Sequence, residues 1–388
     1  MHTLALTEQG AVLHADGDLL VVQRDESVIH RVRAAQLDQL LLFGQIELSS
    51  GAIALIFKHG IDCVFLTARG SFRGRLIGRP SKNASLRLVQ YQRAVDPHFC
   101  LAVARAIVAA KIKHQREVLL RAQRRLQDEP LALALGQMRL LHQRVETALN
   151  LDIVRGLEGQ AAAEYFGQFD KLLRNELFRF ERRSRRPPKN PVNACLSFGY
   201  AVLGAVIETE ILRCGLDPQL GFFHQPEYGR PSLMLDLLEQ FRPMIDQLVL
   251  RLFNRRQLGP ADFDRRSGRP LADILADDSP LAEPAESLDD PLDIPPPTKQ
   301  TAAEATPSDP ENAPHASAQS SSETIGVYLN HTGRKIFLNE LFRRLRERLY
   351  FPPRQASLEL RDIIREQIYQ LARVIEGKQP DFIPFVPG

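Results

Sequence analysis

The sequence predicts an α+β protein in which a β-rich N-terminal domain precedes a helical domain. Residues 1–90 contain short apolar runs separated by turn residues such as Glu8-Gln9-Gly10, a pattern typical of strands. From Asp96 onward, apolar residues recur at helical spacing over long stretches, which predicts helices. About residues 266–322 lack Phe, Tyr and Trp and are rich in Pro, Ala, Ser, Asp and Glu. This composition predicts a disordered insertion within the helical domain.

The first domain is expected to hold several short strands and one helix. The helix begins at Ser49 or Ser50, residue types that cap helices, and runs to about Lys58. The strands are expected at Thr3–Leu6, Ala11–His14, Leu19–Val22, Gln39–Phe43, Ile46–Leu48 and Asp62–Thr67.

Long helices are expected in the second domain, namely His98–Gln127, Leu131–Ala148, Leu151–Arg186, Pro191–Cys214, a helix from Ser232, and Ser357–Glu376. The first of them carries a series of basic side chains, Arg105, Lys111, Lys113, Arg116, Arg121, Arg124 and Arg125. Such a series indicates either a solvated helix face or a surface that contacts DNA. The pattern does not choose between these two interpretations.

Charge is divided unevenly along the chain. The net charge is +3, but Asp273–Glu311 holds eleven acidic residues and one basic residue, which leaves +13 on the remainder. An excess of positive charge favours a polyanionic partner.

The four cysteines are far apart and in apolar surroundings, which indicates neither a zinc cage nor a disulfide framework. No apolar run of membrane-spanning length and no signal pattern is found, so a soluble cytoplasmic protein is expected.

A candidate metal site lies in the stretch from Asn190 to Asp246. A mostly apolar helix is followed by a loop that delivers His224, and the next helix carries Asp236 and Glu239. Carboxylates three residues apart share one helical face, and imidazole with carboxylate oxygens can hold a divalent metal. The alternative is that His224 caps or packs while both carboxylates are solvated. The chain shows no Ser-His-Asp set, Gly-rich phosphate loop or paired Cys motif that would favour a hydrolase, an NTPase or a zinc protein.

The same stretch closely resembles the CRISPR adaptation integrase family, metal-dependent nucleases that insert spacers into CRISPR arrays. The matching segments are N-P-V-N-A-x-L-S-x-G-Y-A, G-L-D-P-x-L-G-F-x-H, G-R-P-S-L-x-L-D-L-x-E-x-F-R-P and the trailing Asp246. Further matches are L-L-L-F-G-Q-I-E-L-S-S-G-A-I-A-L and H-G-I-D-C-V-F-L near the N-terminus, R-G-L-E-G-Q-A-A-A-E-Y-F, and the late G-V-Y-L-N-H-T-G-R-K-I-F-L. The resemblance implies that Gly333 opens a helix that runs to about Tyr350. It covers about residues 1–260 and 325–375. The family often has Asn where this chain has His114.

The resemblance implies three catalytic metal ligands, Glu158, His224 and Glu239, with Asp236 as a second-shell or second-metal residue. Glu158 stands among apolar residues at helical spacing, and a buried carboxylate needs a cation, a hydrogen-bond donor or a proton. Glu158 could instead be a hydrogen-bonded core acid. Glu164 is a rival acid, but it lies on another helical face and outside the motif.

The family also implies a domain plan and a set of partners. Residues 1–90 would form a β-rich homodimerisation domain, and residues 96–260 and 325–376 an all-α metal-binding catalytic domain. The acidic segment 266–322 is not matched by the resemblance, since family members usually connect these helices more briefly, and it is expected to be an inserted, disordered tether or a partner-binding segment. The cofactor would be Mg²⁺ or Mn²⁺, and the partners double-stranded DNA and a small ferredoxin-like companion protein, with no membrane. The densest basic run indicates either a DNA-binding segment or a solvated linker, and its candidate residues are Arg182, Arg183, Arg185, Arg186 and Lys189.

The implied reaction is phosphoryl transfer, in which a DNA 3′-hydroxyl attacks a phosphodiester of the CRISPR leader-repeat. Two other functions stay open at this point. One is a metal-dependent nuclease or resolvase of branched DNA. The other is a DNA-binding scaffold whose metal site is idle.

Overall fold

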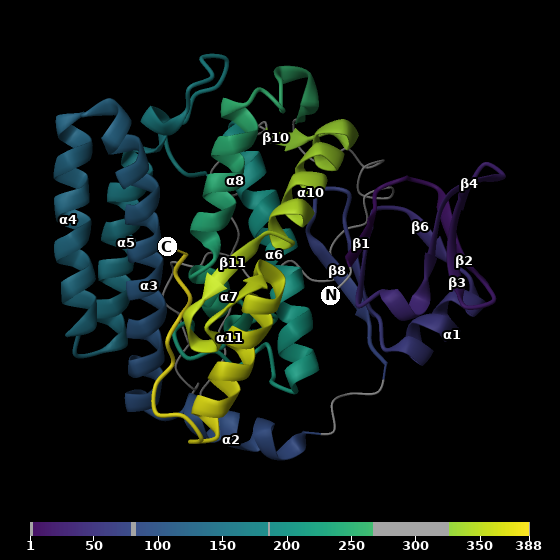
Figure 1. Cartoon of the computed structure of the whole chain (residues 1–388), viewed down its shortest axis with the longest axis horizontal. Helices are drawn as coiled ribbons and strands as arrows, with labels where there is room; N and C mark the ends of the chain where they lie inside the picture. Colours follow the sequence, from purple (N-terminus) through teal and green to yellow (C-terminus); the bar gives the residue numbers. More distant parts are fainter. Residues whose placement is uncertain (1–2, 79–82, 185–186, 267–325, 388) are drawn as a thin grey trace, which may run out of the picture.

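The computed structural model describes residues 3–78, 83–184, 187–266 and 326–387. The expected acidic insertion, apart from Arg266, lies outside the described residues, as do Arg185 and Arg186 of the basic run. Within the described residues, a β domain and a larger helical part lie side by side, with the β domain at the right of Figure 1. The mixed α+β class predicted from the sequence is confirmed.

Two four-stranded sheets form the β domain. One has the order β1-β5-β7-β8 and the other β4-β3-β2-β6. Their strands are β1 (Thr3–Leu6), β2 (Ala11–Asp16), β3 (Leu19–Arg24), β4 (Ser27–Arg33), β5 (Gln39–Phe43), β6 (Ile46–Leu48), β7 (Asp62–Leu66) and β8 (Phe72–Leu76). Helix α1 (Ser50–His59) is capped at its N-terminus by Ser49, whose side chain accepts a hydrogen bond from the Ala52 amide, and at its C-terminus by Gly60 in the left-handed region. The expected strands and this helix are confirmed, whereas β4 and β8 were not expected.

The β1-β5-β7-β8 sheet joins the two parts of the molecule because it is buried on both faces. Successive strand residues point to opposite faces, so Leu40 and Leu42 of β5 enter the core of the β domain. Leu41 and Phe43 face the other way and belong to the core of the helical part, where the Phe43 ring lies 5.9 Å from that of Phe198. A strand buried on both faces reads as a continuous apolar run, as this one does.

The helical part is built around one central helix, α6 (Pro191–Cys214), which most of the other helices surround (Figure 1). Asn190 caps α6 through the Asn193 amide, Pro191 occupies its first turn, and Gly215 ends it in the left-handed region at φ 95°. The others are α2 (Ala84–Ala94), α3 (Pro97–Leu126), α4 (Glu129–Glu146), α5 (Leu151–Gly167), α7 (Ser232–Glu239), α8 (Arg242–Asn254), α10 (His331–Leu345) and α11 (Leu360–Ile375). Helices α3, α4 and α5 stand together at one side.

Helix α6 also corrects the expectation that no apolar segment reaches membrane-spanning length. By length and composition alone, this one helix of the described residues could cross a membrane. Most of it is buried inside the protein, and the core helix of a globular protein has the same composition. Its apolar character therefore follows from its central position.

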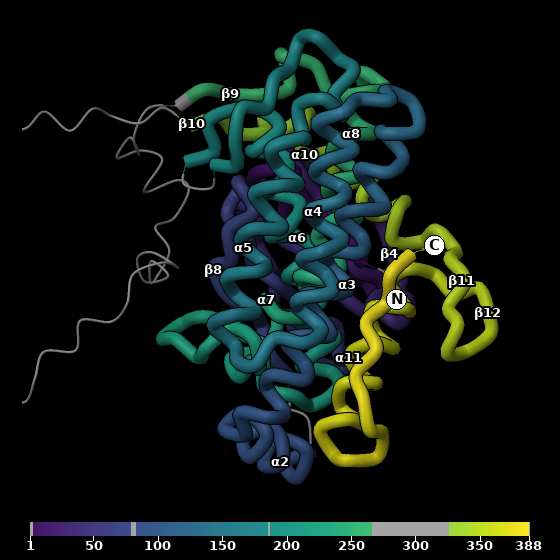
Figure 2. Tube along the Cα trace, turned by 90° about the vertical axis from the view of Figure 1, so that its left-hand side faces the viewer, coloured from purple at the N-terminus to yellow at the C-terminus, as the bar shows by residue number. Residues whose placement is uncertain are grey.

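The family resemblance implied an all-α catalytic domain, but the helical part also contains two β-ribbons. Strands β9 (Phe263–Arg266) and β10 (Gly326–Leu329) pair antiparallel, so the chain leaves and re-enters the described fold at one ribbon. A second ribbon, β11 (Arg348–Phe351) with β12 (Ala356–Glu359), projects at the right of Figure 2. This ribbon ends the expected Gly333–Tyr350 helix early, at Leu345, and starts α11 at Leu360.

The prediction of a single helix from Leu151 to Arg186 was also wrong, because α5 stops at Gly167. After it the chain folds back, and the Asp170 carboxylate accepts a hydrogen bond of 2.7 Å from the Phe180 amide. Phe178 and Phe180 are buried, and the Phe178 ring lies 4.5 Å from that of Phe253 on α8. Aromatic burial against a distant helix outweighs the local helical pattern here.

Candidate metal centre and nucleic-acid interface

Glu239 is the most buried of the three candidate ligands. It is the last residue of α7 and is 5% exposed. One carboxylate oxygen accepts a hydrogen bond of 2.8 Å from Nε of Arg242, and the other lies 2.5 Å from Nζ of Lys111. Burial alone would raise the pKa of Glu239, but Arg242, Lys111 and His224 together hold that pKa well below its usual range. These basic neighbours therefore favour the ionised form of Glu239.

Glu158 approaches the same lysine from a different helix. Its helix, α5, is capped by Asn150, whose side chain accepts a hydrogen bond from the Ile153 amide, and Glu158 lies two turns further on. Its carboxylate forms an ion pair with the Lys111 ammonium and is about three-quarters buried. Two acids that are 81 residues apart in the chain thus face one cation.

Lys111 was not expected to be part of this site. The sequence placed it among the basic residues of a solvated or DNA-contacting helix face, but its side chain on α3 is only 8% exposed. One turn later His114 is also buried, and its Nδ1 lies 3.4 Å from the Gln240 carbonyl oxygen. Burial lowers the pKa of His114 to about 4, which keeps the imidazole neutral. Helix α3 therefore holds the end of α7 through two neighbouring side chains.

His224 is held by Asp236. The Nδ1–H of His224 donates to the Asp236 carboxylate across 2.7 Å, and the same oxygen accepts the His224 amide at 2.8 Å. The other oxygen accepts the amides of Phe222 and Phe223 at 2.6 and 2.9 Å. Asp236 is fully buried, so both of its oxygens are committed within the loop. His224 keeps Nε2 available, and an imidazole oriented by a carboxylate is the usual arrangement of a metal-ligating histidine.

Gly221 makes this packing possible. A Cβ at this position would lie 2.7 Å from Oδ2 of Asp236 and 2.8 Å from the backbone carbon of Ser232. Arg155, one turn before Glu158 on α5, donates to the Phe223 carbonyl at 3.1 Å. The His224 loop is thereby attached to both α7 and α5, the two helices that carry the acids.

The donor set suits a divalent cation, although the side chains are not arranged around one. Among the described residues, no three His, Cys, Asp or Glu side chains converge as metal ligands. Glu158 and Glu239 are bridged instead by the Lys111 ammonium, which forms an ion pair with each of them. This location already attracts a cation, and two carboxylates with one imidazole are ligands that Mn²⁺ and Mg²⁺ accept. The residues therefore fit the implied metal.

A buried acid lies behind the site. Asp246 on α8 is fully buried and accepts a hydrogen bond from the Tyr200 hydroxyl. Burial raises the pKa of Asp246 to about 6, against the lowering effect of Tyr200. The guanidinium of Arg242 lies 4.7 Å from the centre of the Tyr200 ring. Asp246 thus supports, through Tyr200, the arginine that pairs with Glu239.

The basic run divides into exposed and internal side chains. Arg182 and Lys189 are exposed and available to a polyanion. Arg183 is turned inward, where its guanidinium donates to the side chains of Asn193 and Ser197 on α6 at 2.8 and 3.0 Å. Arg183 therefore has a structural role, which the density of positive charge in the sequence did not reveal.

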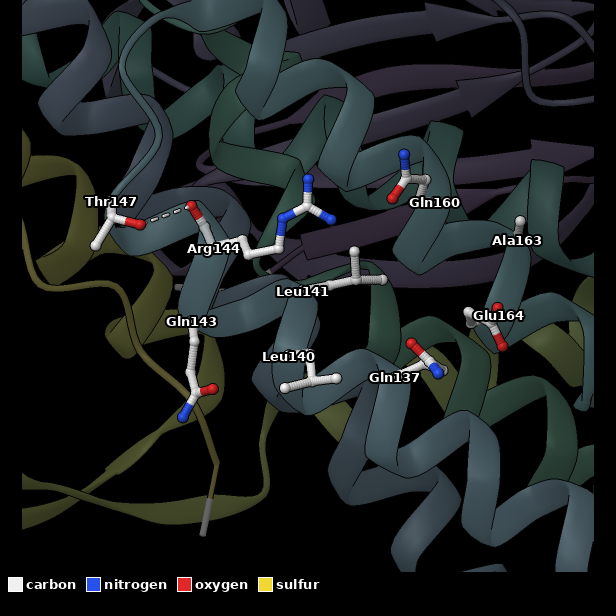
Figure 3. Close-up of a pocket in the computed structure, with 9 residues that line it drawn as sticks. All are labelled: Gln137, Leu140, Leu141, Gln143, Arg144, Thr147, Gln160, Ala163 and Glu164. Atoms are coloured by element: carbon white, nitrogen blue, oxygen red, sulfur yellow. Dashed lines mark hydrogen bonds between the residues drawn. The ribbon is translucent and has the colours of Figure 1, made fainter.

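A pocket of about 670 Å³ lies between α4 and α5, away from the candidate ligands. Figure 3 shows Leu140 and Gln137 of α4 facing Gln160 and Glu164 of α5 across it. Glu158, His224 and Glu239 do not line this pocket. Glu164, the rival acid, thus lies on a different surface from the site.

Comparison with known proteins decides the family. The model for the family described as CRISPR associated protein Cas1 matches residues 4–279. The chain belongs to the Cas1 family. It is 38% identical over 290 residues to CRISPR-associated endonuclease Cas1 2 of Rhodospirillum rubrum, a match that covers 72% of this chain and 83% of that protein. It is 37% identical over 267 residues to a CRISPR-associated exonuclease Cas4/endonuclease Cas1 fusion of Geobacter sulfurreducens, covering 66% of this chain and only 48% of the fusion.

Solved structures share the fold of this Cas1-family chain. A Cas1 protein from Thermotoga maritima superposes with a TM-score of 0.73 at 23% identity, covering 98% of this chain and 99% of that one. A casposase bound to integration product has a TM-score of 0.74 at 20% identity, with coverages of 100% and 95%. A chain of a Cas6-RT-Cas1–Cas2 complex has a TM-score of 0.73 at 22% identity, covering 99% of this chain and 36% of that one. The family resemblance drawn from the motifs is confirmed.

Sequence reasoning missed Lys111, Arg242 and Arg155. Residue type and helical spacing alone do not distinguish any of the three from a solvated basic side chain. The signals that could have found them were the position of Lys111 among apolar residues of a long helix and the presence of Arg155 and Arg242 inside the matching family segments. The assignment of Glu158, His224 and Glu239 as metal ligands stays a prediction.

Proposed function

We propose that this chain is a metal-dependent CRISPR adaptation integrase and DNA endonuclease, and that Glu158, His224 and Glu239 hold its Mg²⁺ or Mn²⁺. One observation carries the proposal. Two carboxylates from separate helices face one buried cation, beside an imidazole whose Nε2 is left available by its bond to Asp236. A purely structural pair of acids would not require an oriented histidine.

The reaction is the transfer of a phosphodiester. A DNA 3′-hydroxyl attacks the phosphorus at the edge of a repeat, a new P–O bond forms, and the existing bond breaks to release another 3′-hydroxyl. When bound, the divalent metal neutralises charge on the phosphate and favours deprotonation of the attacking hydroxyl. Attack by water at the same phosphorus gives endonuclease hydrolysis.

The residues of the chain position these groups. Asp236 fixes the ring orientation and tautomer of His224. Arg242 keeps Glu239 ionised and aimed at the site. The exposed Arg182 and Lys189 are proposed to contact DNA phosphates, because arginine and lysine are the principal phosphate-binding side chains.

The proposed partners are double-stranded DNA, a second copy of this chain and a small companion protein. Structural neighbours support the first and third, since one is a casposase bound to integration product and another is part of a Cas1–Cas2 complex. The homodimer, formed through the β domain, rests on the family resemblance alone.

A strand-transfer assay tests the proposal. Labelled donor DNA is incubated with a repeat-containing plasmid, the companion protein and Mn²⁺, and covalent joining is measured on a denaturing gel. Alanine at Glu158, His224 or Glu239 should each abolish joining while DNA binding persists. Glu164→Ala is the matched control, because this acid of the same helix lies in the α4–α5 pocket, and its activity should be unchanged.

The alternatives predict other results. A nuclease of branched DNA would cleave flaps or junctions without joining donor to plasmid. A scaffold would leave joining equally absent in the wild type and all variants, with DNA binding intact. If all three alanine variants join donor DNA normally, the metal mechanism at this site is wrong.

A further inference from the structure

The buried ammonium of Lys111 is the least expected feature of the site. It contacts one oxygen of Glu158 and lies 2.5 Å from one oxygen of Glu239. The three side chains come from α3, α5 and α7, so this one cation ties together three helices. Arg242 does not duplicate it, because its 2.8 Å hydrogen bond goes to the other oxygen of Glu239.

Without Lys111, the two acids would repel each other. A carboxylate with little solvent access is costly unless a counter-charge is nearby, and removing one partner of a buried ion pair is strongly destabilising. The metal-free fold therefore needs a cation at the position where Glu158 and Glu239 meet.

A divalent ion needs the same two oxygens. An ammonium and a metal cannot both occupy the position between them, and their like charges repel strongly at low effective dielectric. Metal binding and the Lys111 ion pairs are therefore mutually exclusive at these oxygens.

We infer that Lys111 is a built-in counter-cation that holds Glu158 and Glu239 together in the metal-free protein and is displaced from them when a divalent metal binds. Lys111 is thus a positioning residue that preserves the site before loading and limits its affinity for metal. This inference rests on the proposed metal site and adds to it a competition between the protein's own cation and the metal.

Thermal unfolding of the full chain, with chelator and across a Mn²⁺ titration, tests the inference. Lys111→Met should lower Tm in chelator by about 5 °C. The deficit should disappear at saturating Mn²⁺. Because a deficit of about 3 kcal/mol that vanishes on loading must reappear as tighter binding, the Mn²⁺ concentration that gives half of the Tm increase should fall by about a hundredfold. Lys113→Met is the matched control, because Lys113 is exposed on the same helix and should match the wild type in both conditions.

A charge-balanced variant covers the case in which Lys111→Met does not fold in chelator. Combining Lys111→Met with Glu158→Gln removes one positive and one negative charge and leaves the Arg242–Glu239 pair in place, so most of the Tm in chelator should return while the response to Mn²⁺ is lost. If this double variant is no more stable than Lys111→Met, the lysine acts by packing and the inference is wrong.

The remaining outcomes separate this inference from the proposed function. A Lys111→Met variant that is equally destabilised with and without Mn²⁺, or that binds Mn²⁺ no more tightly than the wild type, overturns the inference and leaves the metal site standing. A wild type whose Tm does not respond to Mn²⁺, or to Mg²⁺, overturns the proposed metal site and the inference with it.

Discussion

Replacing Asp236 with alanine would release the His224 loop. The carboxylate accepts three backbone amides, those of Phe222, Phe223 and His224, and in addition the Nδ1–H of His224. All four donors would lose their partner at once, in a place where Asp236 itself has no solvent exposure.

The magnitude follows from those four donors. An unsatisfied buried donor costs about 1–3 kcal/mol, and His224 is partly exposed, with a side chain that is 19% accessible, so water can satisfy some of them. We expect a loss of about 4 kcal/mol in the free energy of unfolding. The His224 side chain itself remains in the variant but is no longer oriented by a carboxylate. Strand transfer should therefore fall by about 10–100-fold and not be abolished, and excess Mn²⁺ should partly restore it.

Urea unfolding and the strand-transfer assay measure the two effects. Glu227→Ala is the control, since this loop carboxylate is exposed and pairs only with Arg230 among the contacts described for it. An Asp236→Ala variant with wild-type stability and full activity would refute the assigned role. If Asp236→Ala were dead while Glu239→Ala joined DNA normally, the ligand assignment of the two acids would be reversed.

Three further predictions concern charge, pH and packing. Affinity for duplex DNA should fall at least about a hundredfold between about 50 and 200 mM salt, and alanine at both Arg182 and Lys189 should lower the slope of log K against log salt by about 2; an unchanged slope removes both from the interface. Burial raises the folded-state pKa of Asp246 to about 6, so its stabilising contribution is present at low pH and lost as pH rises through 6. Relative to Asp246→Asn, the unfolding free energy of the wild type should fall by about 2–3 kcal/mol from pH 4 to 7, and parallel pH profiles would contradict this. Gly221→Ala should reduce strand transfer and Tm together, because its methyl group would lie 2.7 Å from the Asp236 carboxylate; a fully active, stable variant would show that the loop relaxes freely.

Most helices and strands could be predicted from the sequence because the features that define them, such as capping residues and apolar runs, are local. Ser49 and Asn190 cap helices at the positions that their residue types indicate, and the near-continuous apolar run of Gln39–Phe43 is a strand buried on both faces. The errors occurred where a distant contact overrides the local pattern. The helix expected to reach Arg186 stops at Gly167 because Phe178 and Phe180 are buried against other elements.

The candidate site shows the same division between local and distant information. The sequence by itself determined the family and singled out Glu158, His224, Asp236 and Glu239, because long motifs carry residue identity whatever the fold does with it. Only the tertiary structure decided which side chains meet. It turned Asp236 toward the loop amides rather than toward Glu239, and it buried Lys111 between two acids. A lysine in a basic helix has the same sequence signature whether it faces water or an ion pair, so its partners become known only when α5 and α7 pack against α3.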